Sequence, residues 1–288
     1  MHRREFLATA AAVASVPVVA VRAQEAVRIE NDVVYGNAGG EQLLLNLARP
    51  AGDGPFPAVL CIHGGGFRAG TRQGYDAQIR RLAEKGYVAA TVTYRLAPKH
   101  PFPAAVHDVK AAVRWLRANA GKYRIRPDRI GAMGGSAGGH LAQFLGVTAA
   151  VSEFEGDGGN AGQSSAVHCV VNYYGPSDFT QSYGKSVDAH EVLPLFLGGN
   201  LETERARHIR ASPLNWVTPA AAPTLCIHGT DDKYVAYEQA VWLVNRLLSC
   251  GVEAQLVTLP GAGHGFRGED VAKAEAAMMT FFDRRLKG

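Results

Sequence analysis

The chain has 288 residues, of which 47% are hydrophobic and 19% are charged. This composition is that of a globular protein with enough apolar mass for one large core, although length alone also permits two small domains. The 30 lysines and arginines exceed the 26 acidic residues by four and are scattered along the chain, which argues against nucleic acid as a partner.

Paired arginines, Arg3 and Arg4, open the chain and are followed by an apolar run over residues 8–21. The run is shorter than a membrane-spanning helix requires, and it closes with Val21-Arg22-Ala23, which places small residues where a signal peptidase reads. We therefore predict a twin-arginine export signal over residues 1–23, with an uncleaved anchor as the alternative. The expected location is the periplasm or the exterior, with no stable membrane insertion once the signal is removed.

The next segments predict a hairpin and then a buried strand. Residues 27–35 and 42–48 are rich in β-branched and aliphatic side chains, and the turn-forming run 36–40 separates them. After a break rich in proline and glycine, residues 58–62 form a continuous apolar run typical of a parallel strand buried on both faces. We expect an antiparallel hairpin at the edge of a mostly parallel sheet.

The buried strand ends in His63-Gly64-Gly65-Gly66-Phe67, which resembles the oxyanion-hole motif of lipases and esterases with the α/β-hydrolase fold. Glycines in this loop let backbone N–H groups turn toward a carbonyl oxygen with no side chain in the way. Gly65 and Gly66 are therefore the predicted donors, and His63 is predicted to hold the loop rather than to act as a base.

Helices and strands then alternate. Helical spacing over 73–85, an apolar strand over 87–94 and a helix that opens at Pro103 follow in turn. His107 and Asp108 lie inside that second helix. Adjacent helical residues point in different directions, so we expect solvated or capping roles for them and not a catalytic pair.

Residues 129–141 have the pattern of a strand, a sharp turn and a helix around Gly134-Gly135-Ser136-Ala137-Gly138, a G-x-S-x-G pentapeptide. Gly134 and Gly138 remove β-carbons that would clash where strand and helix meet, so Ser136 can be exposed in a strained turn. The N–H of Ala137 then points at the reacting centre beside the positive end of the helix dipole. Taken alone, the pentapeptide also fits a flexible loop or a phosphate cradle.

The last third continues the alternation of strands and helices. Strands are expected over 167–174, 223–229 and 254–259, and helices over 237–248 and 271–286. Residues 180–213 lack a clean period and are a candidate small cap insertion that covers the site. We predict a single α/β domain over 24–288, with helices on both faces of the sheet.

Two loops after the last strands supply the remaining chemistry. Asp232 occupies the acid position of the family pattern His-Gly-x-x-Asp-x-x-Val, and His264 follows the next strand. Serine, then acid, then histidine, each after a strand, is the chain order of α/β-hydrolases. A serine hydroxyl needs a base at neutral pH, and the base needs a carboxylate to fix its tautomer, so Ser136, His264 and Asp232 are the predicted triad. Asp231, expected to face solvent, and Asp178, expected to cap the next segment, are the alternative acids.

Essentially the whole predicted domain resembles the hormone-sensitive-lipase-like branch of α/β-hydrolase esterases, and within it the bacterial acetyl-xylan and feruloyl esterases. The resemblance rests on Tyr94-Arg95-Leu96-Ala97-Pro98, Phe102-Pro103-Ala104-Ala105, Trp115-Leu116, Arg129-Ile130-Gly131 and Ala211-Ser212-Pro213. Two features depart from that branch: Gly135 stands where many of its members carry an acidic residue, and their larger N-terminal cap helices are missing. Both departures favour the carbohydrate esterases.

The resemblance implies a serine carboxylic-ester hydrolase for short acyl groups, acetyl or feruloyl, on a small molecule or an oligosaccharide. The alternatives are an amidase or peptidase with the same triad, a lipase-like esterase for longer chains, and a binding protein without activity. Phe67, Tyr173 and Tyr174 are candidate substrate-binding aromatics because they lie beside or just after strand ends. For the two tyrosines, core packing is the alternative.

The four cysteines are expected to be free thiols. Cys61, Cys169 and Cys226 lie in predicted central strands, and Cys250 closes a helix. The sequence has no cysteine and histidine spacing typical of a metal site, and its glycine loops lack the lysine of a phosphate-binding loop. We therefore predict no metal and no cofactor.

Overall fold

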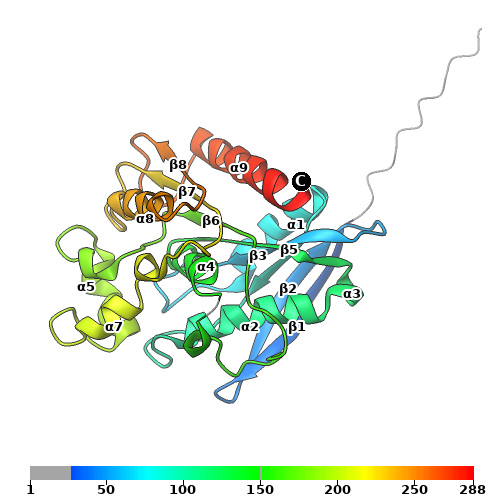
Figure 1. The fold of residues 1–288 in the computed structure, drawn as a ribbon, viewed down its shortest axis with the longest axis horizontal. Helices are drawn as coiled ribbons and strands as arrows, with labels where there is room; N and C mark the ends of the chain where they lie inside the picture. The colour runs from blue at the N-terminus through cyan, green and yellow to red at the C-terminus, as the bar shows by residue number, and fades with distance from the viewer. Residues whose placement is uncertain (1–26, 150) are drawn as a thin grey trace, which may run out of the picture.

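The computed structural model describes residues 27–149 and 151–288, so the predicted signal over 1–23 lies outside the described residues. Eight strands form one sheet in the order β1-β2-β4-β3-β5-β6-β7-β8 (Figure 1). The strands are β1 Arg28–Ala38, β2 Glu41–Arg49, β3 Phe56–Ile62, β4 Val88–Val92, β5 Ile125–Gly135, β6 Cys169–Tyr173, β7 Thr224–Gly229 and β8 Ala254–Leu259. Strand β2 pairs antiparallel with β1 and with β4, and the other neighbours are parallel. The predicted hairpin and mostly parallel sheet are confirmed.

The helices alternate with these strands. They are α1 Asp76–Glu84, α2 Ala104–Ala118, α3 Ala120–Tyr123, α4 Ala137–Val147, α5 Asp188–Glu191, α6 Leu193–Leu197, α7 Arg205–Arg210, α8 Glu238–Ser249 and α9 Glu269–Phe282. A 3₁₀ turn, Arg72–Tyr75, leads into α1, and a π-helical turn, Asp283–Lys287, continues α9. The helices predicted over 73–85 and 271–286 are therefore each one regular helix with an irregular turn at one end. A 3₁₀ turn is common at a helix terminus, and a π-helical turn is rare.

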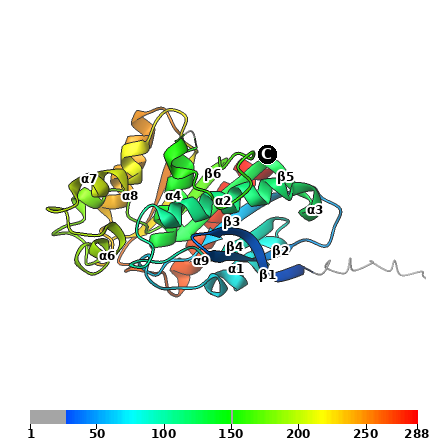
Figure 2. The same cartoon turned by 90° about the horizontal axis from the view of Figure 1, so that it is seen from below.

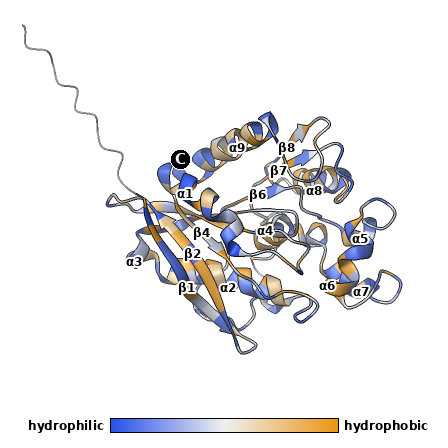
Figure 3. Cartoon of the chain, turned by 180° about the vertical axis from the view of Figure 1, so that it is seen from behind, coloured by the Kyte–Doolittle hydropathy of each residue, from blue (hydrophilic) through white to orange (hydrophobic). Residues whose placement is uncertain are grey.

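Helices cover both faces of the sheet, as predicted (Figure 2). The alternation along β3 sets the two faces: Ala58, Leu60 and Ile62 point into the cluster that holds the apolar residues of α2 and α4. Val59 and Cys61 point into the cluster built with α1 and α9. Because both faces are covered at the centre of the sheet, the inner strands β3 and β4 are apolar and buried along almost their whole length. Helix α9 instead mixes hydrophilic and hydrophobic residues (Figure 3).

Residues 180–213 form the short helices α5, α6 and α7. Some apolar residues of this segment, such as Leu193, Phe196 and Leu197, are buried in the same cluster as those of α2 and α4, whereas others, such as Leu195 and Ile209, are exposed. This mixture explains why no helical stripe is visible in the sequence. The segment is tied to the body of the domain where the N–H of Phe102 donates to the carbonyl of Phe196 at 2.8 Å. It also reaches the glycine loop after β3, because a β-carbon placed on Gly66 would lie 3.0 Å from Val192.

All four cysteines are free, and the three that lie in β3, β6 and β7 are buried. Within residues 27–149 and 151–288, no helix combines the length and the apolar character that crossing a membrane requires.

Candidate active site

Ser136 lies between β5 and α4 with φ 56° and ψ −124°, a backbone conformation that residues other than glycine rarely adopt. The turn is tight because strand and helix almost touch: a β-carbon on Gly134 would stand 2.3 Å from the carbonyl oxygen of Gly138. A β-carbon on Gly138 would stand 2.0 Å from the carbonyl oxygen of Ile62. The predicted close approach at this pair of glycines is therefore present, and it leaves Ser136 at the start of a buried helix.

The ends of β5, β7 and β8 bring the three predicted catalytic side chains together. Ser136 Oγ lies 3.0 Å from His264 Nε2, and His264 Nδ1 lies 2.8 Å from Asp232 Oδ2. A neutral His264 with its proton on Nδ1 donates to Asp232 and accepts the hydroxyl proton of Ser136 at Nε2. The arrangement can move a proton from serine to histidine.

Asp232 is 5% exposed, and both of its oxygens are hydrogen-bonded. Oδ1 accepts the N–H groups of Tyr234 and Val235, each at 2.9 Å, and Oδ2 lies 3.2 Å from Nε2 of a second histidine, His228. Burial acts to raise the pKa of Asp232, but the hydrogen bonds from His228 and His264 outweigh it and hold that pKa well below its ordinary value. The carboxylate is therefore charged at neutral pH.

The two alternative acids lie elsewhere. The side chain of Asp231 is 67% exposed, as predicted, and stands 3.6 Å from Lys233. Asp178 Oδ1 accepts the N–H of Thr180 at 2.9 Å and so caps the 3₁₀ turn that follows it, also as predicted. Among these three aspartates, Asp232 is the one that the fold carries to His264.

The glycine loop after β3 faces Ser136 from the other side. Gly65 and Gly66 have φ of 115° and 59°, and within the described residues neither of their N–H groups donates to a backbone carbonyl. With the N–H of Ala137 at the first position of α4, they are the predicted oxyanion donors. His63 holds this loop, since its Nδ1 lies 2.7 Å from the carbonyl oxygen of Gly64. Burial lowers the pKa of His63, which favours the neutral ring.

A segment after β4 supports the same loop, and it corrects one expectation. The Tyr94 hydroxyl donates to the carbonyl oxygen of His63 at 2.9 Å, and the N–H of Ala97 donates to the carbonyl oxygen of Phe67 at 2.8 Å. Asp108 was expected to be solvated or capping, but it is fully buried and pairs with Arg95 at 2.8 Å. It also accepts the backbone N–H of Arg95 at 2.8 Å. Asp108 faces inward from α2, and its two contacts with Arg95 anchor the segment behind the glycine loop.

A cavity of about 730 Å³ opens above Ser136 and His264. Of the three aromatic residues predicted to bind substrate, Tyr174 lines this cavity and the other two do not. Phe67, with φ 58°, turns its ring into the core, where it is 2% exposed and stacks on Phe196 at 3.9 Å. Tyr173 packs against Phe266 at 5.7 Å and donates its hydroxyl to the carbonyl oxygen of Ala274 at 3.3 Å.

Three lining residues with large polar side chains, Arg68, Tyr75 and Tyr234, were not predicted from the sequence. Arg68 follows the glycine loop by two positions and Tyr234 lies inside the motif that contains Asp232, so proximity to these motifs was a usable signal. Tyr75 has no such signal because it looks like an apolar helix position. A β-carbon placed on Gly135 would lie 3.2 Å from the Tyr75 hydroxyl and 3.1 Å from the Tyr174 hydroxyl. Two phenols therefore occupy the space that an acidic side chain before Ser136 would need.

In the part of the chain that the structure describes, no three histidine, cysteine or acidic side chains are grouped so that they could hold a metal ion.

The eight-stranded sheet and the serine, histidine and aspartate at its strand ends define a protein of the α/β-hydrolase fold. Residues 45–247 match the BD-FAE family model, and the chain belongs to that family. It is 35% identical to esterase LipC of Mycobacterium tuberculosis over 241 residues, which cover 81% of this chain and 59% of LipC. The chain thus spans less than two thirds of the length of this relative.

Two further comparisons cover more of the other protein. An ethyl acetate hydrolase of Pseudomonas putida is 29% identical over 249 residues, which cover 82% of this chain and 75% of that relative. The solved structure of a truncated carbohydrate esterase from gut microbiota superposes with a TM-score of 0.79 at 26% identity, covering 92% of this chain and 99% of that one.

Proposed function

We propose that the protein is a serine carboxylic-ester hydrolase with Ser136 as nucleophile, His264 as base and Asp232 as the acid. The observation that carries the proposal is the continuous hydrogen-bonded chain from Ser136 Oγ through His264 to Asp232, at 3.0 and 2.8 Å. Its position beside an open cavity and the names of the relatives above support the same conclusion.

The proposed reaction has two halves. Ser136 Oγ attacks the ester carbonyl carbon while its proton moves to His264 Nε2, and the N–H groups of Gly65, Gly66 and Ala137 donate to the oxyanion. The carbon–oxygen bond to the alcohol then breaks, and His264 returns the proton to the departing oxygen. Water, activated by His264, repeats the sequence on the acyl-enzyme and releases the acid.

Ser136→Ala tests the assignment directly. Turnover of 4-nitrophenyl acetate should fall by about a million-fold, as expected when a triad nucleophile is removed, while the melting temperature stays at the wild-type value. The exposed Ser249→Ala variant is the control and should keep full turnover. A Ser136→Ala protein that retained more than a few per cent of wild-type turnover would rule out this nucleophile.

For the substrate, we propose a short acyl group, acetyl or feruloyl, on a carbohydrate. The phenol rings of Tyr75, Tyr174 and Tyr234 narrow the cavity, and aromatic rings of this kind favour a small acyl group or stack on a sugar. The ethyl acetate hydrolase and the carbohydrate esterase to which this chain is similar support this choice. Nitrophenyl esters of increasing chain length, run beside acetylated xylan and a feruloyl sugar ester, test it. A specificity constant that climbs from acetyl to octanoyl favours a lipase-like site instead.

We also propose that the protein is exported through the twin-arginine route, on the strength of Arg3, Arg4 and the apolar run that follows them. Full-length protein expressed in a bacterium with this route should appear in the periplasm or the medium. Replacement of both arginines by lysine should leave it in the cytoplasm, and unchanged export of that variant would contradict the proposal.

A further inference from the structure

We propose that His228 is a positioning residue of this site: its Nε2–H holds Asp232 Oδ2 in line with His264, so that the acid is gripped between two histidines. The inference rests on the proposed function, because it assigns His228 a part in the same reaction. His228 does not touch the nucleophile or the cavity, and it would act through Asp232 alone.

The tautomer of His228 follows from its partners. The residue is fully buried near the end of β7, and its Nε2 lies 3.0 Å from the carbonyl oxygen of Val235 and 3.2 Å from Asp232 Oδ2. Both partners are acceptors, so Nε2 carries the proton and shares it between them. Within the described residues, Nδ1 is buried with no hydrogen-bond partner. A proton on Nδ1 would leave a buried donor unsatisfied, which disfavours the other tautomer.

This N–H also closes the loop that carries the acid, residues 230–235. It joins His228, two residues before the loop, to the carbonyl oxygen of Val235 at the loop's end. The N–H groups of Tyr234 and Val235 donate to the other oxygen of Asp232, Oδ1. Three hydrogen bonds, from His264, Tyr234 and Val235, together with the 3.2 Å contact from His228 Nε2, thus surround both carboxylate oxygens of Asp232. The arrangement gives a physical reason for the spacing His-Gly-x-x-Asp-x-x-Val, since one ring nitrogen contacts the residues four and seven positions further along.

The groups around Asp232 determine what loss of the His228 donor should do to the triad. His264 and His228 donate to it, the Tyr174 phenol lies near it from the end of β6, and the Asp188 carboxyl lies near it from α5. Without the His228 donor, Asp232 Oδ2 becomes a stronger acceptor for an imidazolium at His264. It also loses a contact that fixes its orientation, and triad geometry tolerates displacements of only about 0.5 Å.

Three variants separate this role from simple packing. His228→Leu removes the donor, and His228→Gln keeps an amide N–H near the position of Nε2. His140→Leu is the matched control: His140 is also fully buried, its Nε2 contacts the carbonyl oxygen of Ala211 at 2.8 Å, and its Nδ1 has no partner among the described residues. Each variant is assayed on 4-nitrophenyl acetate from pH 5 to 9, with thermal unfolding measured in parallel.

We expect His228→Leu to lower kcat roughly 10- to 100-fold with KM changed less than about threefold, because orientation of the base contributes on this scale. The acid limb of its kcat/KM profile should move to higher pH by roughly half a unit, since the imidazolium is stabilised. His228→Gln should recover most of kcat and return the limb toward wild type. His140→Leu should lose stability without moving the limb. A His228→Leu protein whose limb stays in place, or a Gln variant no better than Leu, overturns the proposal.

An observation independent of turnover distinguishes failure of this inference from failure of the proposed function. Nitrogen NMR of histidine-labelled protein should show His228 protonated at Nε2 alone in the resting protein. A wild-type protein inactive on every ester but with this tautomer would disprove the esterase and leave the contact intact. Nδ1 protonation of His228 would disprove the inference in an active enzyme.

Discussion

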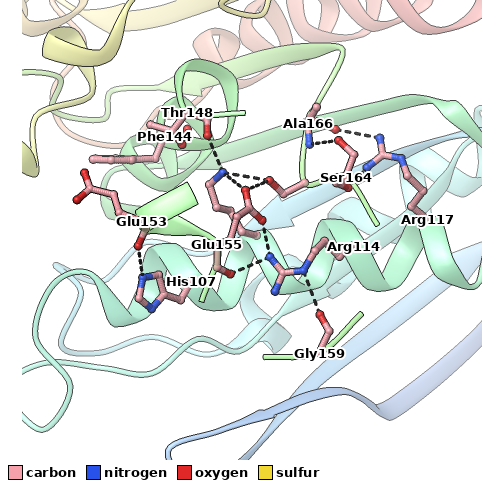
Figure 4. A network of polar contacts seen from close by, with 12 residues as sticks. His107, Arg114, Arg117, Phe144, Thr148, Glu153, Glu155, Gly159, Ser164 and Ala166 are labelled. Atoms are coloured by element: carbon pink, nitrogen blue, oxygen red, sulfur yellow. Dashed lines mark hydrogen bonds and ion pairs between the residues drawn. The ribbon is translucent and has the colours of Figure 1, made fainter. Parts of the chain in front are cut away.

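Two polar networks lie near the two ends of α4, and each is centred on a carboxylate, Asp232 in one and Glu155 in the other. At the N-terminal end, Asp232 is gripped by His228 and His264 beside Ser136. Beyond the C-terminal end, Glu155 accepts from Lys110 at 2.8 Å and from Arg114 at 2.6 Å, and Lys110 also donates to the carbonyl of Thr148 at 2.8 Å (Figure 4).

The partners of the two carboxylates make the difference. The side chains of Lys110 and Arg114 are buried and both pair with Glu155, so this network fastens the loop after α4 onto α2. An imidazole can accept and release a proton during a reaction, and a quarter of the His264 side chain is exposed at the cavity. Glu155, which is held by buried lysine and arginine side chains, has a structural role. Asp232, which is held by an imidazole that reaches an open cavity, can support proton transfer. The partner of the carboxylate therefore decides whether the network anchors a loop or forms a reaction centre.

Among the carboxylates in this comparison, removal of Asp232 should have the largest effect on turnover. Asp232→Asn should lower kcat by about 10⁴, because an amide favours the wrong tautomer of His264 and cannot stabilise its imidazolium. Steady-state kinetics on 4-nitrophenyl acetate measure the loss, and thermal unfolding should show the variant folded. A loss below about tenfold would contradict the role of Asp232.

Removal of Glu155 should lower stability and leave turnover almost unchanged. Glu155→Gln leaves Lys110 and Arg114 buried without a counter-charge, which typically costs about 3–5 kcal/mol of unfolding free energy. Turnover per folded molecule should stay near wild type, because the network lies at the far end of α4 from Ser136. Urea unfolding with active-site titration separates the two quantities. If kcat per folded site fell together with stability, the two ends of α4 would be coupled and the contrast would fail.

The Glu155 network also has a defined acid dependence. Burial acts to raise the pKa of Glu155, but hydrogen bonds from Lys110 and Ser165 outweigh it and hold that pKa below its ordinary value. A carboxyl with a lowered folded pKa contributes stability above about pH 4, and that contribution is lost as pH falls through the folded pKa. The difference between wild type and Glu155→Gln should therefore shrink below pH 4.

The contrast also explains what could be predicted from the sequence. The Ser136, Asp232 and His264 motifs are visible because each combines turn glycines or a fixed spacing with a strand end. Lys110, Arg114 and Glu155 belong to no such pattern, and charged residues within a helix look like a solvated face until the following loop is placed. The inward turn of Phe67 depends on its positive φ, and the contact of Tyr75 on a crossing of distant elements. None of these is encoded in local periodicity.

Asp188 sharpens the comparison, because no lysine, arginine or histidine among the described residues forms an ion pair with its buried carboxyl. Asp188 is 4% exposed, its Oδ1 has no partner among the described residues, and burial raises its pKa to about 7. A carboxyl with a raised folded pKa destabilises the protein progressively as pH rises from about 4 toward 7. Asp188→Asn should therefore stabilise the protein at pH 8, by up to about 4 kcal/mol, and much less at pH 4. Unfolding at both pH values tests the sign, which is opposite to that for Glu155→Gln; a loss of stability at pH 8 would contradict it.

The smallest effect is expected at Asp231, next to the proposed acid in sequence and unlike it in surroundings. Its carboxylate is exposed and pairs with Lys233 at 3.6 Å, a contact that solvent and salt screen. Asp231→Asn should change kcat less than about twofold and the unfolding free energy by no more than about 0.5 kcal/mol. Kinetics at low and high salt, run beside Asp232→Asn, provide the measurement. Equal losses in the two variants would contradict the assignment of Asp232 as the one acid of the triad. A larger loss at Asp231 would transfer the role of the acid to it, because an exposed carboxylate that matters to turnover must reach His264 during the reaction.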